Sequence, residues 1–434
     1  MLITRSFSLG LVLASAFATA SADPAIPVAV DRCAMSRFWS DTYRPDPSFP
    51  SQTRAPTPLR PSTYFVEVLA SGLVHPWSLA FLPDGRMLVT ERPGRMRIIG
   101  TTGTLAEPIQ GLPPIKVVAG EGLHDVLLDR NFKRNRIVYF TYFAPLADGN
   151  LQGEQSQWLS WLALPAGEHE AKAYGYPRLA RARLSDDEKQ LEDVRVILTG
   201  ADRRVVQSAD GKLFVLGAAP AGGLQPVDDE PQRLDNTYGK VLRINADGSV
   251  PKDNPWNGKR GVRPEIFAYG QRDQEGAALN PRTGELWTVE HGPRGGDELN
   301  IIRRGRNYGF PIISYGRNYS GDAIFGGKTQ LVGLEQPIYF WTPSIAPSGL
   351  LFYTGKLFPL WRGSVFVGGL SSKRLVRLQM NGDRVVAEEP LLVERCRRIR
   401  DVRQGPEGAL YVLTEEEDGE ILRINTPKPA APVP

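Results

Sequence analysis

The chain has 434 residues, with 52 lysines and arginines against 48 aspartates and glutamates, so its formal net charge is only +4. So small a charge, without a basic run interleaved with aromatic residues, argues against a nucleic-acid-binding protein. The 44 glycines and 36 prolines are spread along the chain rather than gathered in linkers. Such regular spacing is typical of many short strands joined by turns.

The first residues form a predicted secretory signal. Arg5 precedes the apolar run 7–17, and an A-x-A pattern ending at Ala22 follows. This order predicts cleavage after Ala22. The run is too short for a membrane helix, which needs about 20 residues. We therefore expect a signal peptide over 1–22 and a periplasmic or secreted protein with no transmembrane segment.

Residues 23–62 form a predicted proline-rich arm ahead of the folded body. Of the two cysteines, Cys33 lies in this arm and Cys396 lies near the C-terminal strands. Two cysteines of an exported protein usually pair in an oxidising compartment, which predicts a disulfide between the arm and the body. The alternative is two unrelated thiols.

A repeated plan of strand, tight turn and strand follows. In "SLAFLPDGRMLVTERPGRMRII" apolar and polar residues alternate across a PDG turn, and "DVRQGPEGALYVLTEEEDGEILRI" repeats the plan across PEG. Such a unit is typical of one four-stranded blade of a propeller, in which radial repetition protects the sheet edges. The units lie at 78–99, 125–143, 205–217, 276–290, 363–386 and 401–424.

These units predict an all-β fold, a six-bladed β-propeller over 63–425. A propeller closes its ring when the last blade takes one strand from the N-terminus, and 62–73 is the candidate for that strand. The stretch 147–176 breaks the pattern and is a predicted surface insertion. Residues 426–434 are a predicted disordered tail.

Six strings, taken in order, resemble the soluble pyrroloquinoline-quinone (PQQ)-dependent aldose dehydrogenases, the glucose/sorbosone dehydrogenase family. The resemblance runs from about Thr63 to Asn425. It implies an exported enzyme that uses PQQ and Ca²⁺ to oxidise aldoses at C1 to lactones and that passes electrons to an acceptor. The strings are "HPWSLAFLPDGRMLVTER", "GKVLRINADGSVPKDNP", "EHGPRGGDELNIIRRGRNYGFP", "YSG", "PSIAPSGLLFYTG" and "RIRDVRQGPEGALYVLTEE".

The string "EHGPRGGDELN" has an unusual density of glycine and acid for a connecting loop. The resemblance implies that the backbone carbonyls of Gly292 and Pro293 hold a calcium that polarises the cofactor. It also implies a second, structural calcium at Glu298 and the backbone of Tyr308. Calcium takes hard oxygen ligands, many of them carbonyls, and glycine lets a backbone turn its oxygens inward. The alternative is a hydrogen-bonded turn with solvated acids.

The resemblance also implies a set of cofactor-binding residues. The quinone is a flat tricarboxylate that suits planar bidentate cations, and the matched positions are Arg272, Arg398 and Arg400. The last two are two residues apart, so they share one face of a strand. Asp273 stands at the second position of the family's Arg-Asn pair, and Trp341 is the expected stacking aromatic.

The sequence departs from the family at several matched positions. The catalytic histidine falls on Gly200 in "GADRRVV", and glycine cannot take the sugar's hydroxyl proton as hydride leaves C1. The cofactor-binding glutamine falls on Gly120, and a lysine that contacts the quinone falls on Ser371. At Asp273 a carboxylate replaces an amide, which adds charge repulsion against a tricarboxylate.

The catalytic residue is therefore unknown, and His124, Asp202 and His291 are the candidate bases. A solvated aspartate with a pKa near ~4 is a weak base, and the family's own polar residue at 291 favours a structural role for that histidine. One alternative is a propeller that has lost the chemistry and binds a sugar or a protein partner. Another is a calcium-dependent lactonase, for which Asp273 and Glu275 are the inward acids.

Overall fold

The computed structural model describes residues 43–118, 120–145, 175–217 and 229–427. The predicted signal, the arm up to residue 42, and most of the predicted insertion and tail lie outside these residues. No helix in the described part is long and apolar enough to cross a membrane.

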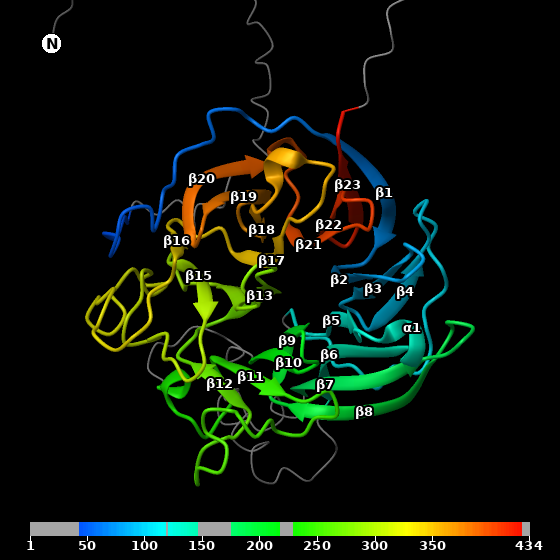
Figure 1. Cartoon of the computed structure of the whole chain (residues 1–434), viewed down its shortest axis with the longest axis horizontal. Helices are drawn as coiled ribbons and strands as arrows, with labels where there is room; N and C mark the ends of the chain where they lie inside the picture. Colours follow the sequence, from blue (N-terminus) through cyan, green and yellow to red (C-terminus); the bar gives the residue numbers. More distant parts are fainter. Residues whose placement is uncertain (1–42, 119, 146–174, 218–228, 428–434) are drawn as a thin grey trace, which may run out of the picture. The chain divides into compact units, whose positions relative to one another are not determined.

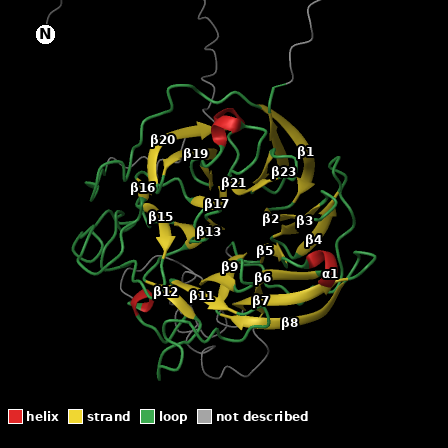
Figure 2. Ribbon diagram, viewed as in Figure 1, coloured by secondary structure: helices red, strands yellow, loops and turns green. Residues whose placement is uncertain are grey.

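Six antiparallel sheets stand around one axis, which confirms the all-β, six-bladed propeller (Figures 1 and 2). We number the blades in chain order from the first inner strand. The strands, from the axis outward, are β2 (Pro76–Phe81), β3 (Met87–Glu91) and β4 (Arg95–Ile99) in blade 1; β5 (Leu123–Leu128), β6 (Ile137–Pro145), β7 (Gly175–Leu184) and β8 (Leu191–Thr199) in blade 2; and β9 (Ala201–Gln207), β10 (Leu213–Gly217), β11 (Lys240–Ile244) and β12 (Ile266–Tyr269) in blade 3.

The second half of the ring follows the same plan. Its strands are β13 (Gln274–Leu279), β14 (Leu286–Glu290), β15 (Asp297–Ile302) and β16 (Tyr339–Trp341) in blade 4; β17 (Pro347–Phe352), β18 (Val365–Gly369), β19 (Arg374–Asn381) and β20 (Arg384–Leu391) in blade 5; and β21 (Ile399–Gln404), β22 (Leu410–Thr414), β23 (Gly419–Asn425) and β1 (Phe65–Leu73) in blade 6. The helices of the described part are one turn each: α1 (Phe132–Asn135), η2 (Glu230–Gln232), η3 (Pro359–Trp361) and η4 (Val393–Arg395).

The ring closes through β1, which is the outermost strand of blade 6. It pairs antiparallel with β23, from Phe65 opposite Asn425 to Leu73 opposite Gly419. The first and last strands of the propeller are therefore hydrogen-bonded neighbours, and the candidate stretch 62–73 contains the closing strand.

Two boundaries differ from the sequence-based expectation. β7 begins at Gly175, so the last two residues of the predicted insertion belong to a strand. The unit expected at 363–386 lacks its inner strand, β17, which begins with Pro347, Ser348 and Gly349. These are poor strand formers, but a Cβ at Gly349 would lie only 2.7 Å from the Cα of Asp401 on β21. Glycine is needed there because neighbouring inner strands approach closely at the axis.

Apolar side chains fill the spaces between adjacent blades. Between blades 4 and 5, Trp287 and Val289 pack with Val365 and Val367, all with 0 % exposure. The ring of Trp287 meets Phe352 edge-on, with centroids 5.0 Å apart. Each such buried side chain contributes roughly 1.5–3 kcal/mol relative to exposure. Blade-to-blade packing thus fixes the inner strands that carry the axial residues.

The described part of the arm, 43–62, covers the outer edge of blade 4. The backbone N–H of Phe340 on β16 donates to the carbonyl of Gln52 (2.8 Å), and the Gln52 amide donates to the carbonyl of Pro337 (2.8 Å). An exposed edge strand invites pairing with other chains. The arm protects this edge.

Candidate functional site

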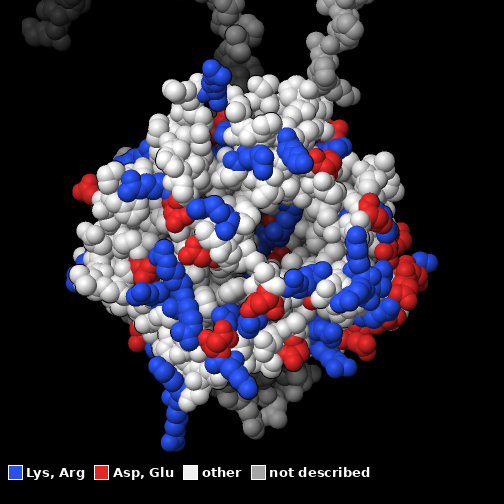
Figure 3. All heavy atoms as spheres, in the orientation of Figure 1, with Lys and Arg blue, Asp and Glu red and all other residues white. Residues whose placement is uncertain are grey.

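The predicted site residues gather at one end of the inner strands. Gly200, Asp273 and Arg398 lie just before inner strands, whereas His291 and Glu415 directly follow second strands. Because the first and second strands of a blade are antiparallel neighbours, both positions lie at the same end of the ring. Figure 3 shows the molecule hollowed at the centre of the ring, with basic side chains inside the hollow.

Three arginines share the carboxylate of Glu415. Arg400 lies 2.5 Å and Arg92 3.0 Å from its Oε1, and Arg398 lies 2.8 Å from its Oε2. Burial opposes ionisation of Glu415, but Arg400 and Arg398 lower its pKa to about 2. The predicted pair Arg398 and Arg400 is therefore brought together, around an acid that sequence reasoning did not single out.

A second set of acids engages the remaining guanidinium groups. Arg400 also lies 2.8 Å from Oε2 of Glu275, and Nε of Arg203 lies 3.4 Å from its Oε1. Arg203 donates in bidentate fashion to Glu121, at 2.9 and 3.0 Å. An incoming tricarboxylate must therefore compete with the chain's own carboxylates.

The aromatic ring at the axis is Trp77 on β2, which is 2 % exposed. The guanidinium of Arg204 lies 4.2 Å from its centroid, and the ring of His124 stacks on it at 5.0 Å and 28°. His124 is 0 % exposed, with Nε2 3.6 Å from Glu121. The ring of His124 is therefore closed to a substrate.

The predicted aromatic, Trp341, lies on the outermost strand of blade 4 and is 5 % exposed. It packs edge-on against Tyr339 with centroids 5.1 Å apart, within the hydrophobic cluster between blades 4 and 5. Its stacking on a cofactor stays a prediction. Trp77 lies in the string "HPWSLAF", which carries part of the family resemblance, but the sequence alone offers no reason to place its ring at the axis.

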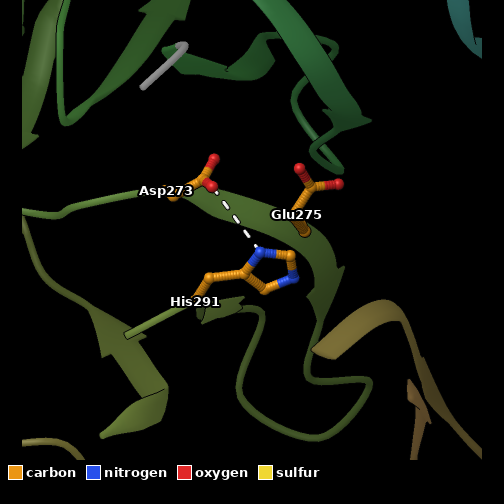
Figure 4. Close-up of side chains that lie close together, drawn as sticks. All are labelled: Asp273, Glu275 and His291. Carbon is orange, nitrogen blue, oxygen red and sulfur yellow. Dashed lines mark ion pairs between the residues drawn. The ribbon is translucent and has the colours of Figure 1, made fainter. Parts of the chain in front are cut away.

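His291 lies between two acceptors (Figure 4). Its Nδ1 is 3.5 Å from Oδ2 of Asp273, and its Nε2 is 2.9 Å from the carbonyl of Pro347. Burial acts to lower the pKa of His291, but Asp273, with Glu275 and Asp297, raises it above its ordinary value. Burial acts to raise the pKa of Asp273, yet His291, with nearby arginines, holds it below its ordinary range. Arg272 donates to the carbonyl of His291 (3.0 Å) and so braces this loop.

The position that the sequence resemblance assigns to a catalytic histidine is sterically closed. Gly200 has φ of +92°, and a Cβ there would overlap Oγ1 of Thr237 and lie 2.9 Å from its Cγ2. A histidine at 200 therefore fits neither the backbone nor the space. Gly120 differs, because although its φ is +93° a Cβ would meet nothing within 4 Å. Of the Asp202 side chain nothing is described.

The glycine-rich loop between β14 and β15 is held by Asp297, the first residue of β15. Asp297 is 0 % exposed and accepts hydrogen bonds from the backbone of Gly292 (2.9 Å) and Ile345 (2.7 Å). It also accepts from the hydroxyl of Ser344. Gly296, with φ of +74°, packs directly against the backbone at Gly316. The acid ties the loop to the segment between β16 and β17, and Gly296 packs it against the connection between β15 and β16.

Two carboxylates face each other at the base of this loop. Glu290 and Glu298 are direct partners across β14 and β15, and the Asn300 amide donates to both, at 3.0 and 3.1 Å. Burial, and then Glu298, raises the pKa of Glu290 well above its ordinary value. Burial likewise raises the pKa of Glu298 to about 7. Two acids held together in this way fit a cation.

A small cavity of about 10 Å³ opens at this pair, which is room for one ion or one water molecule. All four predicted calcium residues line it, together with Glu290. Glu290 opens the string "EHGPRGGDELN", but the resemblance assigned calcium only to other residues of that string and to Tyr308. The lining includes Arg272, Glu290, Gly292, Pro293, Glu298 and Tyr308.

This arrangement can be compared with known proteins. The sequence model of the family described as Glucose / Sorbosone dehydrogenase matches residues 73–423. The chain belongs to this family. It is 39 % identical over 376 residues to aldose sugar dehydrogenase YliI of Escherichia coli, covering 84 % of this chain and 94 % of that protein.

Solved structures of aldose sugar dehydrogenases share the fold of this chain. The apo-form of the soluble aldose sugar dehydrogenase from Escherichia coli superposes with a TM-score of 0.74 at 36 % identity, covering 84 % of this chain and all of that one. The PQQ-bound form of an aldose sugar dehydrogenase from Streptomyces coelicolor has a TM-score of 0.63 at 22 % identity, over 84 % of this chain and 99 % of that one. At that identity the second likeness concerns the fold alone.

Proposed function

We propose that this chain is an exported, PQQ- and calcium-dependent aldose dehydrogenase of low turnover, which oxidises aldoses at C1 to lactones. Membership of the family supports the reaction class. The rate of oxidation is limited by the lack of a base at position 200. There, φ of +92° and the side chain of Thr237 leave no room for one. General base catalysis is typically worth about 10² to 10⁴-fold.

Calcium binding is the part of this proposal with the best geometric support. Glu290 supplies a buried and Glu298 a half-buried carboxylate, and Gly292, Pro293 and Tyr308 line the same cavity. Calcium prefers carboxylate and carbonyl oxygens. We assign the structural calcium to this cavity, next to the two glutamates, and the calcium at the carbonyls of Gly292 and Pro293 stays a prediction.

The residues fit the quinone only in part. The quinone, when bound, supplies the hydride acceptor, and Arg398 is placed to bind its carboxylates because its side chain is 43 % exposed. Arg400 is tied to both Glu415 and Glu275, and Asp273 places a negative charge beside Arg272, at 3.9 Å. We therefore expect weak quinone binding as well as slow oxidation.

Reconstitution tests this proposal directly. Purified apoprotein is mixed with quinone and Ca²⁺, its absorbance spectrum is recorded, and glucose is then titrated. We expect a quinone spectrum altered by binding, and a kcat at least ~10²-fold below the ~10 s⁻¹ of a typical enzyme. An Arg398→Gln variant should weaken quinone binding, whereas Arg260→Gln, at an exposed position, should not. Full activity of the unmodified protein would show that another residue acts as the base.

A second candidate is a propeller that has lost the oxidation and binds a sugar or a protein partner. The pairing of Arg203, Arg398 and Arg400 with internal acids favours it, because a site already neutralised does not require an anionic cofactor. An unchanged quinone spectrum, together with glucose binding in calorimetry, would support this candidate over the first.

A further inference from the structure

Two acids and a histidine converge at the start of β13. The nearest ligand atoms of Asp273, Glu275 and His291 all lie within 4.8 Å of one another, and Figure 4 shows the side chains pointing toward a common space. Asp273 and His291 are joined by a backbone hydrogen bond of 2.9 Å. The three side chains therefore stand on rigid, adjacent backbone.

His291 is oriented in the manner of a metal ligand. Its Nε2 lies 2.9 Å from the carbonyl of Pro347, outside the cluster. A proton on Nε2 makes that hydrogen bond and leaves Nδ1 turned toward Asp273. Metal-ligating histidines almost always donate their second ring N–H to a carbonyl or carboxylate, which fixes the tautomer and the ring.

The carboxylate of Asp273 has unused capacity. Its Oδ1 is buried and has no hydrogen-bond partner among the described residues, whereas its Oδ2 faces His291. An ionised carboxylate oxygen that is buried and unpartnered is costly. A cation bound to the Asp273 carboxylate through Oδ1 removes that cost.

We propose that Asp273, Glu275 and His291 form a binding site for a first-row divalent transition metal, with Zn²⁺ as the representative ion. One imidazole and two carboxylates suit zinc. Calcium takes oxygen ligands, so the imidazole separates this site from the one at Glu290 and Glu298. Three protein ligands leave a coordination position open for water or a small ligand.

Neighbouring guanidinium groups limit the affinity of this site. Arg400 holds Oε2 of Glu275 at 2.8 Å, so Oε1 is the oxygen that faces the metal. Arg203 lies 3.4 Å from that Oε1 and loses this ion pair when a metal binds. Arg272 lies 3.9 Å from Asp273. The affinity is therefore lower than that of a closed structural zinc site.

The proposal stands apart from sugar oxidation. The family resemblance implies an asparagine at position 273, where this chain has the carboxylate that would serve as a metal ligand. Binding of Zn²⁺ needs neither quinone nor sugar, and its failure leaves the proposed function untouched.

The test is a Zn²⁺ titration of chelator-treated, dialysed protein in excess Ca²⁺, followed by calorimetry and by metal analysis after gel filtration. We expect one zinc per chain. Asp273→Asn, an isosteric change, should weaken zinc binding at least 10-fold and keep calcium binding. Glu298→Gln should do the reverse. In parallel, Co²⁺ should give a visible absorption band that is lost in Asp273→Asn.

Either of two results would overturn the proposal. The first is no zinc bound to the wild type in excess Ca²⁺. The second is equal zinc affinity of the wild type and Asp273→Asn, with both proteins folded by circular dichroism. Loss of zinc in Glu298→Gln instead would place the ion in the calcium site and would count equally against it.

Discussion

Replacing Gly200 by alanine tests whether the site can still accept a catalytic side chain. The residue has φ of +92°, and a Cβ would overlap Oγ1 of Thr237. The left-handed backbone costs a non-glycine residue about 1–2 kcal/mol, and overpacking adds about 1–3 kcal/mol. We expect Gly200→Ala to lower the free energy of unfolding by roughly 2–5 kcal/mol.

The chain offers a matched control for each contribution. Gly211 has φ of +86°, and a Cβ there would meet nothing within 4 Å, so Gly211→Ala should cost only the backbone share, about 1–2 kcal/mol. Thr237→Ala removes Oγ1 and Cγ2, and should recover about 1–3 kcal/mol of the Gly200→Ala loss in a double-mutant cycle. Urea unfolding followed by tryptophan fluorescence measures the wild type and each variant.

The reasoning would be refuted if Gly200→Ala were no more costly than Gly211→Ala, or if Thr237→Ala gave no recovery. The position could then hold a side chain, and Gly200→His would become a route to restored activity. With the expected result, Gly200→His alone adds no activity, because the backbone as well as the imidazole has changed.

The metal site, the ion pairs and the cysteines each support a further prediction. Chelation of calcium should lower the melting temperature by several degrees, because a ligand that binds only the folded state stabilises it. Glu298→Gln should remove most of the effect of chelation. Glu417→Gln, at an exposed position, should leave that effect unchanged. The pKa of Glu415, about 2, lies below its ordinary 4.5. Ionised Glu415 therefore contributes up to about 3 kcal/mol to the free energy of unfolding above pH 4.5, and this contribution is lost as pH falls through 2. Glu415→Gln should make the free energy of unfolding depend less on pH between 4.5 and 2. Cys33 and Cys396 should appear as one linked peptide pair in a non-reduced digest of exported protein, and two alkylatable thiols would contradict the pairing.

The sequence by itself determined the blades. Alternation across turns such as "PDG" and "PEG" depends only on neighbours along the chain, and period-2 alternation is enforced wherever one face of a strand is buried. The same local logic placed the closing strand and the glycine-rich loop. Local patterning did not predict β17, because Pro347 and Gly349 are poor strand formers. The close approach of the neighbouring strand β21 explains the glycine at 349.

The partners of the charged residues were decided by the tertiary structure. Arg398 and Arg400 could be assigned to one face of a predicted strand, but their acids could not. Glu415 directly follows β22 of blade 6, and Glu275 lies on β13 of blade 4. Likewise a glycine at 200 is visible in the sequence, whereas the wall formed by Thr237 is not. Charge pairing and steric closure depend on distances between strands and between blades, and those distances exist only once the strands have paired and the blades have packed.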